Sequence, residues 1–171
     1  MAESKVFEWA GIGFGEREAY AIQKSLKGLS TTSTASQVRF WGKIHGTQKD
    51  YYIAEGVLEG EDEVPEGEEE AEKPKDFEPR GGGVNKYCYW VNDNPVKGSW
   101  VKLPDISPDE IKASRLIKVS FTGDLDRKIF TNPFFLGSEK IYLRAQIARI
   151  SHSTTLVAAG VWKVGEPDDD G

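Results

Sequence analysis

Residues 38–58 read VRFWGKIHGTQKDYYIAEGVL, and this stretch decides the fold class. Its first half alternates between apolar and polar positions, residues 46–50 have turn-forming composition, and the two-residue period resumes in YYIAEGVL. Alternation on both sides of a turn predicts an antiparallel β-hairpin. The period of the first strand assigns Val38, Phe40 and Ile44 to one face, and Arg39, Trp41 and Lys43 to the other.

Two helices are predicted around this hairpin. Helical spacing of apolar residues predicts an amphipathic helix over residues 16–29, which Gly28 and the following Ser/Thr cluster end. A short strand at residues 7–10 precedes it. The second, short helix begins at Ser107-Pro108-Asp109-Glu110, which combines an N-cap, a proline at the first helical position and a capping-box glutamate, and it runs to about Ser114.

Further strands are predicted after residue 84. The segments with strand composition are NKYCYWV (85–91), WVKL (100–103), LIKVSF (116–121) and LVAAGVWKVG (156–165). In KIYLRAQIARIS (140–151), two-residue alternation favours a strand, while Leu143, Ile147 and Ile150 also fit a helical period, so a helix is the alternative. Short strands, two helical pieces and no regular βαβ alternation predict an α+β fold around a mainly antiparallel sheet.

Charge is distributed unevenly along the 171 residues. The net charge is −6, but residues 59–80 contain 11 acidic and three basic residues, and residues 166–171 contain four acidic residues and no basic one. Eight Phe, six Tyr and five Trp argue against disorder of the rest. We therefore expect a single domain over residues 1–171. Its parts are folded segments at 5–58 and 84–165, a disordered acidic insert at 59–83 and an acidic tail at 166–171.

The sequence offers few residues for catalysis or cofactor binding. The glycine run at residues 11–15 has Glu16 where a dinucleotide fingerprint needs its third glycine, and no phosphate-binding loop is present. His45 and His152 are distant in sequence, and Cys88 is the single cysteine, which excludes an internal disulfide. The first residues lack the basic and apolar regions of a signal peptide, so we expect none, and the sequence contains no apolar run of about 20 residues. We expect a soluble, intracellular protein that is not an enzyme and holds no cofactor or metal.

Nucleic-acid binding is an alternative that the residue types leave open. Outside its acidic segments the chain has an excess of lysine and arginine, and cations are interleaved with aromatic residues. The residues that could form a base-stacking sheet are Lys86, Tyr87, Tyr89, Trp90, Trp100 and Lys102. Against this, KYCYWV lacks the glycines of the RNA-recognition signature, and the acidic insert would compete with phosphate.

Seven blocks, read together and in order, resemble the radial spoke head protein 4/6 family of the motile cilium. They are FEWAGIGFGEREAY, RFWGKIHG, DYYIAEG, NKYCYWVNDNP, WVKLPDISPDEI, SRLIKVSFTGDLD and YLRAQIARIS. The likeness covers most of residues 6–165, and it includes a Glu-rich insert between YYIAEG and NKY. Family members usually have a longer chain on both sides of this region, so the resemblance is to a short or truncated member.

The resemblance implies a structural, non-enzymatic subunit of the radial spoke head in the axoneme of cilia and flagella. Such a subunit pairs with a second copy or a paralogue and assembles with other spoke head and stalk proteins. It makes transient contact with central-pair projections, and the spoke relays that contact to the dyneins. No membrane and no nucleic-acid partner is implied, and the family supplies no catalytic residues to transfer.

Three tryptophans are the candidate interface residues: Trp41, Trp90 and Trp100. Tryptophan dominates the energetics of many protein interfaces, and these residues lie on predicted strands. The alternative is that they belong to the core of a small sheet. The sequence does not separate these two interpretations.

Overall fold

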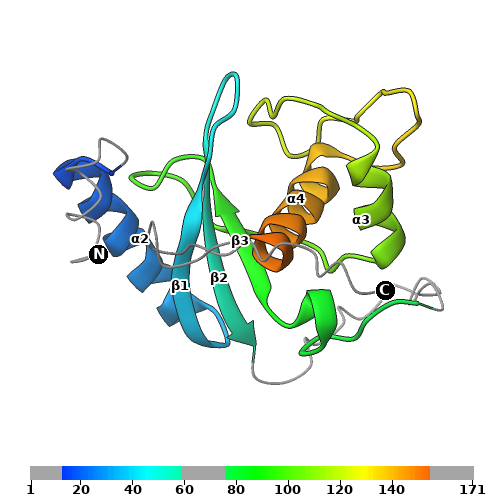
Figure 1. The fold of residues 1–171 in the computed structure, drawn as a ribbon. Coiled ribbons are helices and arrows are strands. Elements are labelled where there is room, and N and C mark those ends of the chain that lie inside the picture. The colour runs from blue at the N-terminus through cyan, green and yellow to red at the C-terminus, as the bar shows by residue number, and fades with distance from the viewer. Residues whose placement is uncertain (1–12, 59–75, 155–171) are drawn as a thin grey trace, which may run out of the picture.

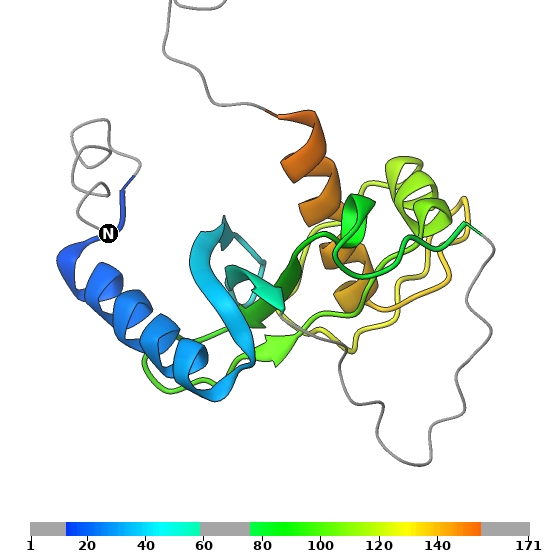
Figure 2. The same cartoon turned by 90° about the horizontal axis from the view of Figure 1, so that it is seen from below.

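The computed structural model describes residues 13–58 and 76–154 of the chain. Its elements are α2 Glu16–Thr32, β1 Ala35–Ile44, β2 Tyr51–Leu58, the 3-10 helix η1 Gly83–Asn85, β3 Cys88–Asn92, β4 Val101–Lys102, α3 Pro108–Arg115 and α4 Glu139–Ser153. The strands form one antiparallel sheet in the order β1-β2-β3-β4. Helix α2 lies on one side of this sheet, and α3 and α4 lie on the other (Figure 1). Figure 2 shows the same layers from below. The predicted α+β class is confirmed.

Several predictions fall outside the described residues. They concern the strand at 7–10, the first part of the acidic insert at 59–75, the strand at 156–165 and the acidic tail at 166–171. Residues 76–83, the remainder of the expected insert, are described and make defined contacts. The Glu78 carboxylate accepts a hydrogen bond from the Val84 N–H (2.6 Å), and Arg80 forms an ion pair with Asp105 (2.6 Å).

The predicted hairpin is confirmed as β1 and β2, but strict alternation fails in β1. The register shifts between Phe40 and Gly42, where the strand has a β-bulge. The extra residue inverts the alternation beyond it. Ile44 therefore packs on the α4 side of the sheet, opposite Val38, and Lys43 reaches a carboxylate of α2. The predicted faces of Ile44 and Lys43 are wrong for this reason.

The sheet is covered on both faces. Predicted strands at 85–91 and 100–103 are confirmed as β3 and β4, and all five residues of β3 are buried. The core on the α4 side consists of Tyr51, Ile53, Tyr89, Val91, Leu103, Leu143 and Ile147. The core on the α2 side consists of Leu29, Ala35, Ala54, Cys88 and Trp90. Burial of both faces explains why β3 is apolar without alternation.

Both predicted helices are confirmed. Helix α2 continues three residues beyond the predicted end, and in this last turn the Thr31 and Thr32 hydroxyls donate to the carbonyl oxygens of Lys27 and Gly28. Helix α3 begins with the predicted capping box: the Ser107 hydroxyl accepts from the Glu110 N–H, and the Glu110 carboxylate accepts from the Ser107 N–H. These reciprocal bonds satisfy two backbone donors that a helix start leaves free.

Residues 139–153 are a helix, α4, so the preferred strand prediction for residues 140–151 is wrong. Leu143 and Ile147 pack on the sheet, whereas Ala145 and Ala148 pack on α3. A helix that contacts neighbours on two sides has apolar residues around much of its circumference, which weakens the 3.6-residue signal. The apolar residues of α4 that face the sheet and those that face α3 together produce a two-residue alternation typical of a strand.

Residues 116–121 were also predicted as a strand, and this prediction is wrong. The segment pairs with no strand in the described part of the chain. Ile117 packs with Ile129 and Phe135 in a separate cluster, and the Phe121 carbonyl accepts from the Thr47 N–H in the β1–β2 turn (2.8 Å). Ile117 is thus buried by packing against other loop residues and α4, whereas Leu116 is 69% exposed.

Candidate functional site

The three candidate tryptophans lie on two sides of the sheet. Trp41 is half-buried on the α4 side, and its indole N–H donates to the Ser151 hydroxyl of α4 (3.0 Å). Trp90, which is 5% exposed, and Trp100 share the apolar cluster on the α2 side. The Trp100 indole N–H donates to the Ser25 hydroxyl (2.8 Å). The structure therefore brings Trp90 and Trp100 together and separates Trp41 from them.

The residues of the nucleic-acid alternative are divided in the same way. Tyr89 and Tyr87 pack into the core on the α4 side, and the Lys86 ammonium lies 5.3 Å from the centre of the Tyr87 ring. Trp90 and Trp100 lie on the α2 side. The aromatic rings do not form one open platform on which successive bases could stack. Nothing in the described residues favours nucleic-acid binding.

The residues that could act as nucleophiles or metal ligands lie in separate elements of the fold. His45 lies in the β1–β2 turn with its Nδ1 3.3 Å from an Asp50 carboxylate oxygen, and His152 is exposed in the last turn of α4. Cys88 is buried in β3. Among the described residues, no group of three or more His, Cys, Asp or Glu side chains could hold a metal ion. No helix in the described ranges combines the length and apolarity needed to cross a bilayer.

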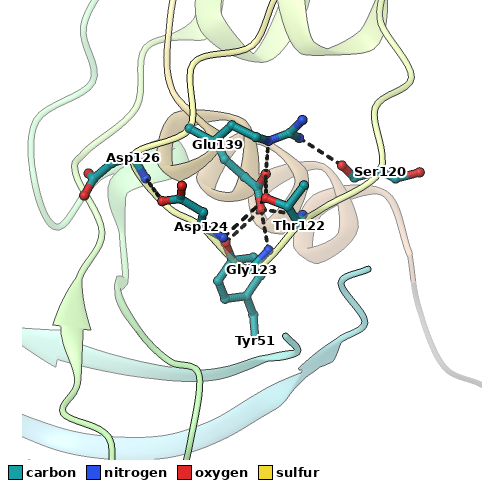
Figure 3. A network of polar contacts seen from close by, with 8 residues as sticks. Tyr51, Ser120, Thr122, Gly123, Asp124, Asp126 and Glu139 are labelled. Carbon is teal, nitrogen blue, oxygen red and sulfur yellow. Dashed lines mark hydrogen bonds and ion pairs between the residues drawn. The ribbon is translucent and has the colours of Figure 1, made fainter. Parts of the chain in front are cut away.

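Figure 3 shows a buried carboxylate that joins three parts of the fold. Glu139, at the start of α4, is fully buried. It accepts hydrogen bonds from the Tyr51 hydroxyl (2.8 Å), from the N–H (2.8 Å) and hydroxyl (2.8 Å) of Thr122, and from the Gly123 N–H (3.0 Å). Arg127 Nε contributes an ion pair at 2.8 Å. Five donors thus surround the two carboxylate oxygens.

These donors determine the ionisation of the site. Burial raises the pKa of Glu139, but the hydrogen bonds from Gly123, Tyr51 and Thr122 outweigh burial and hold that pKa below its usual value. Burial, and then the hydrogen bond to Glu139, raises the pKa of Tyr51. A carboxylate whose acceptor capacity is filled by its own chain is suited to hold the fold together. It offers no free oxygen for acid–base chemistry.

A second polar network joins α2 to the hairpin. The Lys43 ammonium lies 2.8 Å from the Glu18 carboxylate and 3.1 Å from that of Asp50. The Tyr52 hydroxyl donates to Glu18 at 2.6 Å. Burial opposes the ionisation of Lys43 and of Glu18. The hydrogen bonds of this network outweigh burial, so the pKa of Lys43 is raised and the pKa of Glu18 is lowered. This network therefore fixes the position of α2 on the sheet.

A buried arginine makes the third internal connection. Arg144 of α4 is 2% exposed, and its Nη2 donates to the Val84 carbonyl oxygen (2.8 Å) and to Asn85 Oδ1 (3.2 Å). Its guanidinium carbon lies 4.6 Å from the centre of the Tyr89 ring, a cation–π contact. Burial lowers the pKa of Arg144 and raises the pKa of Tyr89 to about 12. Arg144 thus connects α4 to η1 and β3.

Exposed apolar side chains gather on the loop before α4, residues 129–137. Phe130 is 83% exposed, Phe134 69% and Leu136 81%. Large apolar side chains concentrated in one short loop are unusual on a soluble domain and are typical of contact surfaces for other proteins. The sequence signal for this loop is KIFTNPFFLGS (128–138), a dense apolar run around Asn-Pro.

This loop has a defined conformation. Ile129 (3% exposed) and Phe135 (2% exposed) are buried in one cluster with Tyr142, whose ring centre lies 5.7 Å from that of Phe135. The Ile129 N–H donates to the Gly137 carbonyl oxygen (3.3 Å). The backbone between these anchors is held in place, so the loop has little backbone freedom left to lose on binding.

The described chain is an α+β scaffold whose charged networks satisfy its own fold. Its two most exposed large apolar side chains, Phe130 and Leu136, lie with Phe134 on one ordered loop. An ordered loop with exposed apolar side chains is typical of domains that bind other proteins. The chain belongs to the radial spokehead-like protein family, whose model matches residues 1–80 and 73–171.

Named relatives agree with this assignment. The chain is 41% identical to human radial spoke head protein 4 homolog A and 36% identical to mouse radial spoke head protein 6 homolog A, with 99% of the chain aligned in each case. It is 32% identical to flagellar radial spoke protein 4 of Chlamydomonas reinhardtii over 97% of its length. The chain spans 27%, 29% and 39% of these three relatives, respectively.

Proposed function

We propose that the chain is a structural, non-enzymatic subunit of the axonemal radial spoke head in cilia and flagella. It acts by protein contacts that help to relay signals from the central pair to the dyneins. The observation that carries this proposal is the ordered loop at 129–137 with its three exposed apolar side chains. The names of the relatives support the location, because each is a radial spoke protein.

The proposed partners are a second copy or a paralogue, other spoke head and stalk proteins, and, transiently, central-pair projections. The loop at 129–137 suits a lasting contact, because burial of Phe130, Phe134 and Leu136 is insensitive to salt. The acidic segment at 59–80 suits transient contacts, because attraction between exposed charges steers encounter and is screened by salt. Pairing should therefore persist at about 0.5 M salt, where the screening length is well below 10 Å.

Co-purification of spoke components with the tagged chain from ciliated cells tests this proposal. The wild-type chain should bring down other spoke head proteins, and the double variant Phe130→Asp/Leu136→Asp should bring down much less. Tyr20→Asp is the matched control, because Tyr20 is 68% exposed on α2, across the sheet from the loop. Equal recovery with all three chains would show that the loop is not the contact surface. Absence of spoke proteins with the wild-type chain would contradict the proposed function.

A further inference from the structure

A groove lies between α2 and the segment that carries β4. Its volume is about 600 Å³. One wall is a stripe of α2 that runs from Lys24 to Ser33, and the other is formed by residues 95–100 and Lys102, with Trp90 between them. At a rise of about 1.5 Å per residue this stripe is about 14 Å long, which matches roughly four residues of extended peptide. We call this hollow the α2 groove.

The centre of the helical wall is a glycine. Gly28 lies within α2, where glycine is a poor helix former, and a Cβ built on it would meet no atom within 4 Å. Its φ is not positive, so neither the backbone conformation nor packing within the chain requires glycine here. The missing side chain keeps the α2 groove open at its middle. Five residues further on, at the C-cap of α2, the Ser33 hydroxyl is buried without a hydrogen-bond partner in the described structure.

The charge of the α2 groove is of one sign. Three lysines line it, Lys24, Lys97 and Lys102, and no Asp or Glu does. Its accessible apolar surface is supplied chiefly by Val96, which is 74% exposed, and by the half-buried Pro95 and Trp100. An occupant must therefore carry negative charge and at least one apolar side chain. An extended acidic peptide meets both requirements.

Two other anionic occupants fit less well. A single-stranded oligonucleotide needs ring faces for stacking, but Trp90 is 5% exposed and the Trp100 indole is bonded to Ser25. The chain's own acidic segment, residues 59–75, follows Leu58, which pairs with Ala35 near the end of the groove, but it rejoins the described structure before η1, which Arg144 connects to α4 on the opposite side of the sheet. Its path is therefore tied at both ends, unlike that of a segment from another chain. The geometry favours a segment from another chain.

We propose that the α2 groove binds an extended acidic segment of a partner protein. The inference rests on the proposed function to the extent that such a subunit works through protein contacts. It adds a second contact surface, on the side of the sheet away from the loop at 129–137. The groove also gives a role to Trp90 and Trp100, which line it together.

The test is fluorescence anisotropy with the full chain and a labelled short peptide composed of glutamates and two leucines. We expect saturable binding that weakens with salt and is about tenfold weaker for Lys24→Ala. Gly28→Glu should abolish binding, because its side chain fills the groove and repels the peptide. Gly28→Ala should retain binding, and Lys27→Ala is the matched control, since Lys27 does not line the groove. Melting temperatures establish that each variant is folded.

Several results would overturn the inference: equal affinity for a peptide with glutamines in place of glutamates, unchanged binding by Gly28→Glu, or tighter binding of an oligothymidine. Binding that needs prior replacement of the chain's own acidic residues at 59–72 by glutamine would assign the groove to that segment instead. Failure of peptide binding by a chain that still recovers spoke proteins would reject only this inference. Failure to recover spoke proteins would reject the proposed function.

Discussion

The Tyr51 hydroxyl donates a 2.8 Å hydrogen bond to the carboxylate of Glu139, which lies 88 positions later in the chain. This bond connects the start of β2 to the start of α4. The same carboxylate holds the backbone of Thr122 and Gly123, so one buried charge fixes the sheet, the helix and the intervening loop in one arrangement. We regard Glu139 as the principal polar anchor of the fold.

Glu139→Gln should lower the free energy of unfolding by about 3–5 kcal/mol, because it removes a buried charge that is paired with Arg127 and presents an amide donor to surrounding donors. Tyr51→Phe removes one of the five donors to the Glu139 carboxylate and should lower the free energy of unfolding by about 1 kcal/mol. Urea unfolding of both variants measures these changes. Asp126→Asn, at an exposed position, is the control and should stay within about 0.5 kcal/mol of wild type. A loss below 1 kcal/mol for Glu139→Gln would show that the network contributes little.

Stability should also fall in acid. The folded-state pKa of Glu139 lies below its ordinary value of 4.5, so its contribution is complete above that value and is lost as the pH falls through the folded-state pKa. Urea midpoints measured between about pH 6 and pH 3 should therefore decline, and the decline should be shallower for Glu139→Gln. Parallel curves for the two proteins would contradict the assignment of this acid sensitivity to Glu139.

The sequence predicted the hairpin, α2, the capping box of α3, and strands β3 and β4, because each has a local signal of period or cap. It failed for α4, since Ala145 and Ala148 pack on α3 while Leu143 and Ile147 pack on the sheet, and no single face remains polar. The loop at 129–137 was missed for a different reason. Its three phenylalanines all resemble core residues, and only the fold shows that Phe135 is buried whereas Phe130 and Phe134 are exposed.

Arg144 distinguishes the helix from the rejected strand. A strand with Leu143 and Ala145 inward would expose Arg144, whereas in α4 it is 2% exposed and bonded to Val84 and Asn85. Arg144→Ala should therefore cost about 2–4 kcal/mol, through a cavity and the lost hydrogen bond to the Val84 carbonyl oxygen. Arg115→Ala, at an exposed position, is the control. Equal stability of the two variants in thermal or urea unfolding would contradict the helical assignment.

The acidic residues 60–72 should be dispensable for folding, whereas Glu78, which bonds to the folded part of the chain, should not be. Replacement of residues 60–72 by a Gly/Ser segment of equal length should shift the melting temperature by no more than about 2 °C, because such composition cannot bury enough apolar surface to offset its ordering entropy. Glu78→Ala should lower stability by about 1–2 kcal/mol, since its carboxylate holds the N–H of Val84 (2.6 Å). A large loss with the Gly/Ser segment would show that these acidic residues stabilise the fold.

The most direct test of the central claim is to locate the tagged chain in axonemes by cryo-electron tomography. The chain should be expressed in ciliated cells that lack their own radial spoke head protein of this family, and the tag should be resolved by subtomogram averaging. The account predicts tag density at the spoke head for the wild-type chain and for Tyr20→Asp, and its loss for Phe130→Asp/Leu136→Asp. Wild-type chain absent from the axoneme, or bound to it away from the spokes, would contradict the account.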